Sequence, residues 1–424
     1  MAILLKNATF INWQTLEFKN TNILVEEGIN GKIQFIDKVE QTDSKKIKQT
    51  IDCTGKLVTK SFAVGHHHVY SALAKGMPPP KKSPDDFCEI LKYVWWTIDK
   101  CLDKEMIEYS ALATAMACAK AGSTFAIDHH ASPNFIKGSL NIIADAFDKV
   151  GVNHLLCYEI TDRDGLDKAQ QGLEESEEYI KNRQGLVGLH ASFTLGENSL
   201  SNAVDIARKH DSGLHVHVAE DLYDQKYTKE TYGKSVVQRF HEAGVLELPK
   251  TILVHCLHLD QLDREFINKS DCWVVENMES NLNNNVGYFN GKGIGNNIML
   301  GTDGMHSDML QSAKAAFFVG QKHDIIDYPS VYQRFRNVHN YLSRNNFNGD
   351  GDNNLVVLDY KTATEINQEN FLGHFVFGIN SSHVTDVISN GKLIVKDRNI
   401  ESVDENTILL ESQKLGKKLW KMIQ

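Results

Sequence analysis

The sequence is poor in several features, and each shortage excludes a class of protein. No apolar run approaches the roughly 18 residues that span a bilayer, and the N-terminus has no charged segment leading into a long apolar stretch. Basic runs interleaved with aromatic residues are also lacking, and the net charge is -10. These shortages argue against a membrane protein, a secreted protein and nucleic acid as a partner. The acidic excess favours a neutral or cationic small molecule as partner over an anionic one.

Cysteine is scarce as well. The seven cysteines are an odd number, lie far apart along the chain and form no Cys-x-x-Cys motif. A disulfide framework is expected in short secreted chains with an even number of cysteines. Reduced thiols fit this pattern better, so we expect a cytoplasmic protein.

The texture of the chain changes twice along its length. Residues 1–58 are typical of short strands separated by turns. In residues 59–350 apolar runs alternate with longer helical stretches, and strands return in residues 351–424. We predict that the two ends together form one small β-sandwich domain, with a closing helix over residues 405–424. The central part would be a separate, metal-dependent domain.

Eight apolar runs in the central part have the length of core strands. Helical stretches lie between most of them, and the clearest, residues 104–121, has apolar side chains at helical spacing. Eight strands that alternate with helices predict an α/β fold, a (β/α)₈ TIM barrel. The runs are residues 58–66, 124–129, 154–159, 186–191, 214–218, 251–256, 272–276 and 298–302.

Histidine is concentrated at the carboxyl ends of these strands, where a parallel barrel carries its chemistry. His66 and His68 end the first strand, and they share a face because strand side chains alternate. His217 ends the fifth strand and Asp303 follows the eighth. Three imidazoles and a carboxylate suit zinc, although iron and manganese accept the same donors. We predict one divalent metal ion held by these four residues.

Residues near this set can move protons. A metal ion of this kind lowers the pKa of bound water toward about 7. Glu220, three residues after His217, is placed to carry protons between that water and the substrate. His255 is expected to polarise or hold the attacking oxygen, and Asp303 to act as both ligand and proton acceptor. We expect His215 to be a hydrogen-bonded structural residue.

Several motifs of the chain resemble those of the amidohydrolase superfamily. They are GHHHVYSAL (65–73), LHVHVAE (214–220), VHC (254–256) and LGTDG (300–304). YEITDRDG (158–165), HASFT (190–194) and ESN (279–281) are similar to the branch of hydrolytic deaminases and chlorohydrolases, and within it to the SsnA-type aminohydrolases. The resemblance covers nearly the whole chain.

The resemblance implies a mononuclear hydrolase of carbon–nitrogen bonds. Metal-bound hydroxide would release ammonia from an amidine-like C–N bond of a small heterocycle or guanidine-like compound. The ligands would be His66, His68, His217 and Asp303, with Glu220 and His255 as the acid–base and water-orienting groups. A homodimer is also implied. The expected substrate-binding residues are His129, Tyr158, Arg163, His190 and Glu276.

Two departures from the family pattern and several alternatives remain. Lys60-Ser61 stand in place of Pro-Gly, which we expect to alter only the local backbone. Glu276-Asn277-Met278 stand in place of His-Asn-Pro, which leaves the substrate class open. The insertion of residues 75–96 is a lid, a binding loop or a dimer contact. A chlorohydrolase or amide hydrolase with the same site, or a non-catalytic metal-binding homologue, stays possible.

Overall fold

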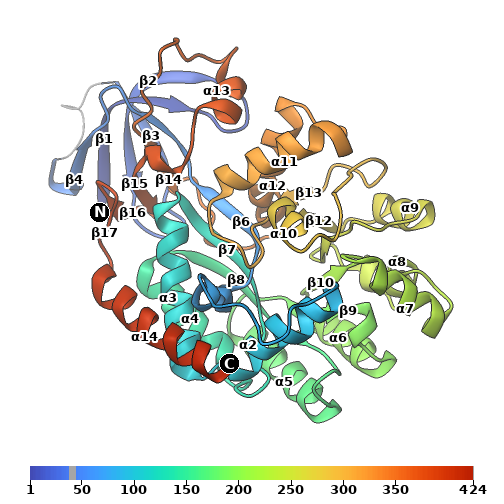
Figure 1. The fold of residues 1–424 in the computed structure, drawn as a ribbon. Helices are drawn as coiled ribbons and strands as arrows, with labels where there is room; N and C mark the ends of the chain where they lie inside the picture. Colours follow the sequence, from blue (N-terminus) through green and yellow to red (C-terminus); the bar gives the residue numbers. More distant parts are fainter. Residues whose placement is uncertain (38–43, 424) are drawn as a thin grey trace.

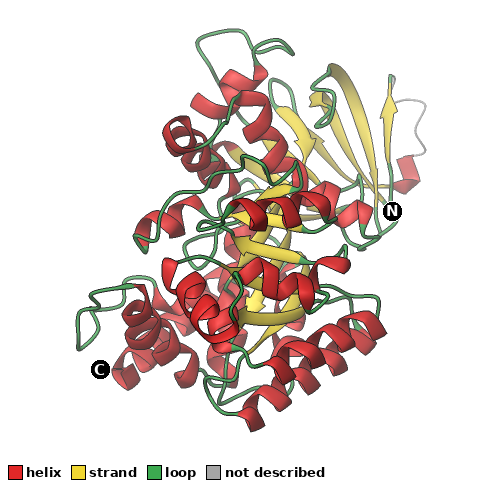
Figure 2. Cartoon of the chain, turned by 90° about the vertical axis from the view of Figure 1, so that its right-hand side faces the viewer, coloured by secondary structure: helices red, strands yellow, loops and turns green. Residues whose placement is uncertain are grey.

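The predicted barrel is present and its strands are all parallel. The computed structural model describes residues 1–37 and 44–423, which form two sheets with helices around them (Figures 1 and 2). One sheet has eight strands in sequence order, which confirms the (β/α)₈ barrel. The strands are β6 (Phe62–His67), β7 (Ser123–His130), β8 (Asn153–Ile160), β9 (Val187–Ala191), β10 (Leu214–Val218), β11 (Ile252–His255), β12 (Trp273–Glu276) and β13 (Ile298–Leu300).

The barrel closes where its first strand, β6, meets its last, β13, and we call this junction the seam; hydrogen bonds join the two strands at their carboxyl ends. The backbone N–H groups of Thr302 and Asp303 both donate to the carbonyl oxygen of His66, at 3.0 and 3.1 Å. His67 and Asp303 also form an isolated parallel bridge. The seam therefore joins the same two segments that carry predicted metal ligands.

Helices cover the outside of the barrel, and many begin at a polar cap. Asp103, for example, accepts a hydrogen bond from the N–H of Met106 at the start of α3. The helices are α3 (Lys104–Lys120), α4 (Ser139–Val150), α5 (Leu166–Asn182), α6 (Glu197–Lys209), α7 (Leu222–Tyr232), α8 (Val236–Glu242), α9 (Gln261–Lys269), α10 (Met278–Asn283), α11 (Met309–His323) and α12 (Tyr328–Arg344). No helix among the described residues is long and apolar enough to cross a bilayer.

Both ends of the chain contribute to the second sheet. Its order is β17-β16-β15-β14-β5-β1-β2-β3, and β4 pairs with β1 beside β5. The sheet encloses a hydrophobic cluster of its own, which includes Leu5, Val58 and Val357. The strands are β1 (Ala2–Ile11), β2 (Phe18–Glu26), β3 (Ile33–Ile36), β4 (Ile47–Asp52), β5 (Leu57–Lys60), β14 (Leu355–Leu358), β15 (Val384–Ser389), β16 (Lys392–Lys396) and β17 (Asn399–Ile400).

The run at residues 58–66, which we predicted as one strand, is divided between the two sheets. β5 ends at Lys60 in the second sheet, and β6 begins at Phe62 in the barrel. Arg336 fixes this crossing, since its Nη1 donates to the carbonyls of Lys60 (3.1 Å) and Ser61 (2.9 Å). Lys60 is itself buried against Asp350, with 3.0 Å between Nζ and Oδ1. The change from Pro-Gly therefore adds a buried ion pair, not only a local change of backbone.

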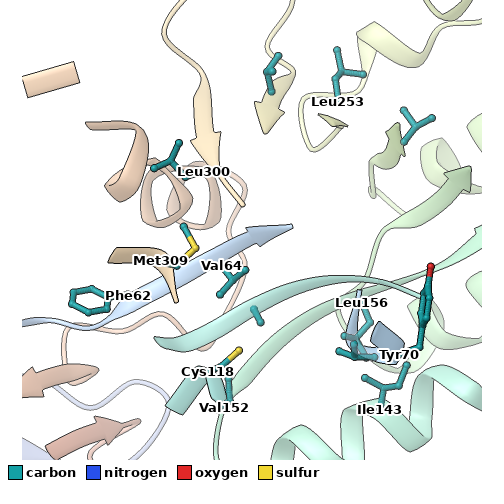
Figure 3. Close-up of a cluster of buried hydrophobic side chains, with 14 of the residues drawn as sticks. Phe62, Val64, Tyr70, Cys118, Ile143, Val152, Leu156, Leu253, Leu300 and Met309 are labelled. Atoms are coloured by element: carbon teal, nitrogen blue, oxygen red, sulfur yellow. The ribbon is translucent and has the colours of Figure 1, made fainter. Parts of the chain in front are cut away.

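Hydrophobic side chains fill the space between the barrel and its helices. Figure 3 shows Phe62 and Val64 of β6, Leu156 of β8 and Met309 of α11 within this cluster. Burying such side chains is the main favourable contribution to folding, at about 1.5–3 kcal/mol for each. The cluster holds the strands rigidly, so that their ends can position polar groups.

The insertion and the last helix lie on the same side of the barrel. The insertion folds into α1 (Phe87–Ile90), a π-helical turn (Leu91–Trp95) and α2 (Trp96–Cys101). α14 (Glu405–Ile423) packs along α3 and α2, and α13 (Phe371–Phe377) lies near α11 and α12 (Figure 1).

Candidate active site

The first two histidines reach the barrel interior because β6 is irregular just before them. The pairing of β6 with β7 changes register between Val64 and His67. This shift turns His66 and His68 inward, whereas Val64 faces the helices. Gly65 permits the close approach, because a Cβ there would lie 2.6 Å from the carbonyl oxygen of Leu300.

The four predicted ligands converge. His68 Nε2 lies 3.2 Å from His217 Nε2 and 3.3 Å from Asp303 Oδ1, and His66 Nε2 lies 3.7 Å from the same oxygen. Donor atoms about 2.1 Å from a tetrahedral ion are about 3.4 Å apart. The observed separations therefore fit a single ion of this size.

Hydrogen bonds to the other ring nitrogens turn the free nitrogens toward the same point. His68 Nδ1–H donates to the carbonyl of His129 (2.6 Å), and His217 Nδ1–H donates to that of His190 (2.9 Å). With the proton on Nδ1, each neutral ring keeps a lone pair on Nε2. Burial lowers the pKa of His217 well below its usual value and so favours this neutral form.

His66 is held differently, by a second histidine. Its Nδ1 lies 2.9 Å from His215 Nε2, and His215 Nδ1 lies 3.5 Å from the sulfur of Cys157. His66 Nε2 is buried and has no hydrogen-bond partner among the described residues. A buried lone pair left open in this way is what a metal ligand requires. His215 thus has the structural contact expected of it.

The carboxylate of Asp303 completes the donor set. Burial opposes its ionisation, but the imidazoles of His66 and His68 hold the pKa of Asp303 well below its usual range. The residues present therefore fit a divalent ion, with three neutral imidazoles and one charged oxygen.

Glu220 and His255 lie beside this set. His255 Nε2 is 3.5 Å from Glu220 Oε2 and 3.6 Å from Asp303 Oδ2. Burial, with the charge of Asp303, raises the pKa of Glu220 well above its usual value. A carboxyl of this kind can hold a proton near neutral pH and give it up again.

Asn281 orients His255, a role that sequence reasoning missed. Its Oδ1 accepts a hydrogen bond from His255 Nδ1 at 2.8 Å, which leaves Nε2 unprotonated in the neutral ring. The available signal was the ESN motif at residues 279–281.

Left-handed backbone recurs around the site. Ala219, His255 and Asp303 have φ of 47°, 69° and 50°, and all three directly flank or belong to the set described above. Such a conformation costs of order 1 kcal/mol or more for a residue with a side chain. The surrounding packing maintains it and so aims these side chains.

A pocket of about 600 Å³ opens onto the ligand set. The insertion supplies aromatic and aliphatic walls of this pocket. A π-helical turn is a frequent feature of functional sites, and here it brings Trp95 and Trp96 together into the wall. The lining includes Tyr70, Phe87, Leu91, Trp95, Trp96, Asp99, Glu159, Arg163, His190 and Glu220.

A buried group of charges forms one wall, and we call Asp99, Glu159, Arg163 and Asp164 the Arg163 cluster. Arg163 donates to Glu159 (Nη1, 2.8 Å), to Asp164 (Nε, 3.1 Å) and, through Nη2, to Asp99. Its guanidinium lies 5.0 Å from the ring centre of Trp96. Sequence reasoning missed Asp99, which lies in α2, just after the insertion.

His190 lines the pocket as expected. Its Nδ1–H donates to Thr194 Oγ1 (2.8 Å), since that hydroxyl donates to the carbonyl of Ala191 (3.1 Å). The other ring nitrogen, Nε2, therefore remains an acceptor.

Three expected substrate residues lie elsewhere. His129 is fully buried below the ligands, and its Nε2 contacts the carbonyls of Leu189 and His215. Tyr158 packs against Gly172 of α5, because alternation along β8 puts it on the face opposite Glu159. Glu276 points away from the pocket too.

Glu276 belongs to a second buried group, and we call Glu276, Asp324 and Arg334 the Arg334 cluster. Arg334 Nη1 donates to Glu276 Oε2 (2.8 Å) and to Asp324 Oδ2 (2.6 Å). The replacement of histidine at position 276 therefore concerns the packing of α12 on β12, not the wall of the pocket.

Known proteins resemble this chain over nearly its full length. The model of the amidohydrolase family matches residues 64–331. A 5-methylthioadenosine/S-adenosylhomocysteine deaminase of Desulforamulus reducens is 23% identical, covering 98% of this chain and 99% of its own. A 5'-deoxyadenosine deaminase of Methanopyrus kandleri is 25% identical over 95% of each chain. The structure of an adenosine deaminase from Xanthomonas campestris with bound zinc superposes with a TM-score of 0.83, at 14% identity over 99% of this chain and 98% of the other.

Proposed function

This chain belongs to the amidohydrolase family, and on that premise we propose that it is a metal-dependent aminohydrolase. It releases ammonia from a C–NH₂ group of a small heterocycle or a guanidine-like compound. The observation that carries the proposal is the meeting of His66, His68, His217 and Asp303 beside a protonatable Glu220.

The proposed ligands are these three histidines and Asp303. When bound, a divalent ion supplies the Lewis acidity that activates water for attack on carbon. Zinc is our first choice, because the neighbouring deaminase structure contains it and because imidazole and carboxylate suit it. Iron and manganese accept the same donors and belong in the test.

The chain itself moves the protons. Water adds to the carbon that bears the amino group, and Glu220 passes one of its protons to the neighbouring nitrogen. Asp303 accepts the second, which leaves with ammonia as the C–N bond breaks. His255, held by Asn281, fixes the attacking oxygen through its free Nε2.

The proposed substrate contacts are those that line the pocket. His190 offers an acceptor at Nε2, and Tyr70, Phe87, Trp95 and Trp96 form walls that suit a flat ring. The similarity to deaminases of adenosine derivatives places such compounds first among the candidates.

Ammonia release tests the proposal. Protein stripped with chelator and reloaded with zinc, iron or manganese would be offered adenosine derivatives, aminopurines, aminopyrimidines, pterins, amidines and guanidines, together with chloro-substituted heterocycles and amides. We expect ammonia from at least one class, and none from the Glu220→Gln variant with full metal content. Chloride or an amine as the only product would replace the deaminase assignment with a chlorohydrolase or amide hydrolase. Full metal occupancy without turnover on any class would favour a non-catalytic homologue.

A further inference from the structure

The Arg163 cluster takes no part in the proton transfers above, yet it faces the reaction centre. A ligand atom of Glu159 lies within 4.8 Å of ligand atoms of both His129 and His217. Glu159, Asp99 and Arg163 are all buried and all line the pocket. A substrate bound in this pocket can therefore contact both the proposed metal ligands and this wall.

Arg163 is already engaged by carboxylates, which use three of its five N–H groups. Each of its three side-chain nitrogens already donates to a carboxylate, namely that of Asp99, Glu159 or Asp164. Lys100 adds one more positive charge, 3.0 Å from Asp164 Oδ1. Of these groups only Asp99, Glu159 and Arg163 line the pocket. Burial raises the pKa of Asp99 to about 7, so this lining is neutral while Asp99 is protonated and has a net negative charge above that pH.

The carboxylates do have acceptor capacity to spare. Asp99 Oδ1 is buried and has no hydrogen-bond partner among the residues described. His129 Nδ1 lies 3.5 Å from Glu159 Oε2. In the neutral ring of His129 the N–H group is at Nε2, because Nε2 donates to the carbonyls of Leu189 and His215. Nδ1 therefore has no hydrogen to donate to Glu159.

We infer that this wall is the specificity element of the site. It selects substrates whose non-reacting end is uncharged or cationic and presents N–H or O–H donors, and it excludes a carboxylate or phosphate at that end. The inference rests on the proposed function and narrows its substrate class to donor-rich compounds such as amidines, guanidines and polyhydroxylated or amino-substituted heterocycles.

Elementary electrostatics supports this selection. A buried carboxylate oxygen without a donor is costly, and a ligand N–H or O–H relieves that cost. A ligand anion beside Glu159 and Asp99 would meet like charge in a pocket of low dielectric, where repulsion is strong.

Binding of three nearly isosteric probes tests the inference. Benzamidinium, benzamide and benzoate have charges of plus one, zero and minus one, and calorimetric titration of the metal-loaded protein gives their affinities. We expect wild type to prefer benzamidinium, and Glu159→Gln to reduce the ratio of benzamidinium to benzoate affinity by about tenfold or more. Attraction of benzoate to the ion is common to all variants, so it cancels in this comparison.

Asp164→Asn is the matched control, because Asp164 contacts the same guanidinium but does not line the pocket. It should change the ratio by less than about twofold. Asp99→Asn is the second test variant should Glu159→Gln fold poorly. An unchanged ratio in both test variants, an equal change in Asp164→Asn, or no binding of benzamidinium to wild type would overturn the inference.

The outcome is separable from that of the ammonia assay. If the affinity ratios change as expected but no compound yields ammonia, the inference on the Arg163 cluster stands and the proposed deaminase activity does not. If ammonia is released but the affinity ratios are the same in wild type and both test variants, the proposed deaminase activity stands and the inference on the Arg163 cluster does not.

Discussion

Two buried arginines in this protein have similar surroundings but different positions. The side chains of Arg163 and Arg334 are both 8% exposed, and each contacts at least two carboxylates and the face of an aromatic ring. The Arg163 cluster lines the pocket, whereas the Arg334 cluster lies outside the barrel, between β12 and α12.

The difference shows that buried charge alone does not identify a functional site. In the Arg334 cluster the charges fasten a helix to a strand. Each cluster keeps one buried acceptor without a partner among the described residues, Asp99 Oδ1 in the first and Glu276 Oε1 in the second, but only Asp99 lines the pocket beside the proposed metal ligands. Position on the inner or outer face of the barrel separates the two roles, and variants can test the separation.

The largest effect should come from the pocket side, at Glu220. We expect Glu220→Gln to lower kcat by about 10²–10⁴-fold, because proton transfer by a positioned carboxyl contributes that much. Thermal stability and metal content should not fall, since Glu220 is not among the proposed ligands. Steady-state kinetics and elemental analysis of the same preparation would measure both. Retained activity would remove Glu220 from the mechanism.

The next effect belongs to the outer cluster. Arg334→Met leaves Glu276 and Asp324 buried without their cation, which should cost about 3–5 kcal/mol in the free energy of unfolding. Denaturant titration measures it, with Arg208→Met, at an exposed ion pair with Glu247, as the control that should change little. The KM of the folded Arg334→Met variant should equal that of wild type. A raised KM would indicate that the Arg334 cluster contributes to substrate binding.

A smaller loss is expected at Asn281. Asn281→Leu removes the acceptor that holds His255, and one buried hydrogen bond is worth about 1–3 kcal/mol, which corresponds to roughly 10–100-fold in kcat. Asn281→Asp keeps an acceptor and should restore much of the rate. Equal losses in both variants would argue against the orienting role. The pH profile of kcat should shift in Asn281→Leu only.

The last effect concerns pH. Burial raises the pKa of Asp99 to about 7, against about 3.9 in an unfolded chain. Between these values the folded protein keeps a proton that the unfolded chain has lost, so this stabilising contribution is complete at low pH and is lost as pH rises through about 7. Wild type should therefore lose stability relative to Asp99→Asn between about pH 4 and pH 7. Parallel unfolding curves of the two proteins across this window would contradict the shift.

Much of the fold and the ligand set follows from two rules applied to the sequence. Side chains alternate along strands, and strand ends meet at one edge of a parallel barrel. These two rules put His66 and His68 on one face and bring the strand ends that carry His217 and Asp303 near them, but the register shift after Val64, which turns the two histidines inward, was not predictable from them. The change from one sheet to the other at Ser61 was not predictable, because a single apolar run in the sequence contains both β5 and β6.

The substrate wall was harder to predict. Side chains alternate along a strand, so Tyr158 had to face the helices if Glu159 faced the barrel interior. The same rule, applied from Val275, predicts that Glu276 faces the helices. Asp99 had no such signal, since a residue in a short helix outside the predicted strands reaches the pocket only through tertiary packing. Arg163 did have a signal, the YEITDRDG motif, whereas Arg334 had none.

The seam of the barrel gives the proposed metal site a consequence for the stability of the whole barrel. His66 and Asp303 belong to the first and last strands of the ring, and an ion held by both would act as a clasp on a loop of more than two hundred residues. An ion that binds only the closed ring stabilises it by mass action. Stripping the ion should therefore loosen the whole cylinder, so that a chelator lowers Tm and speeds amide exchange in β6 and β13 before it does so in β8 and β9.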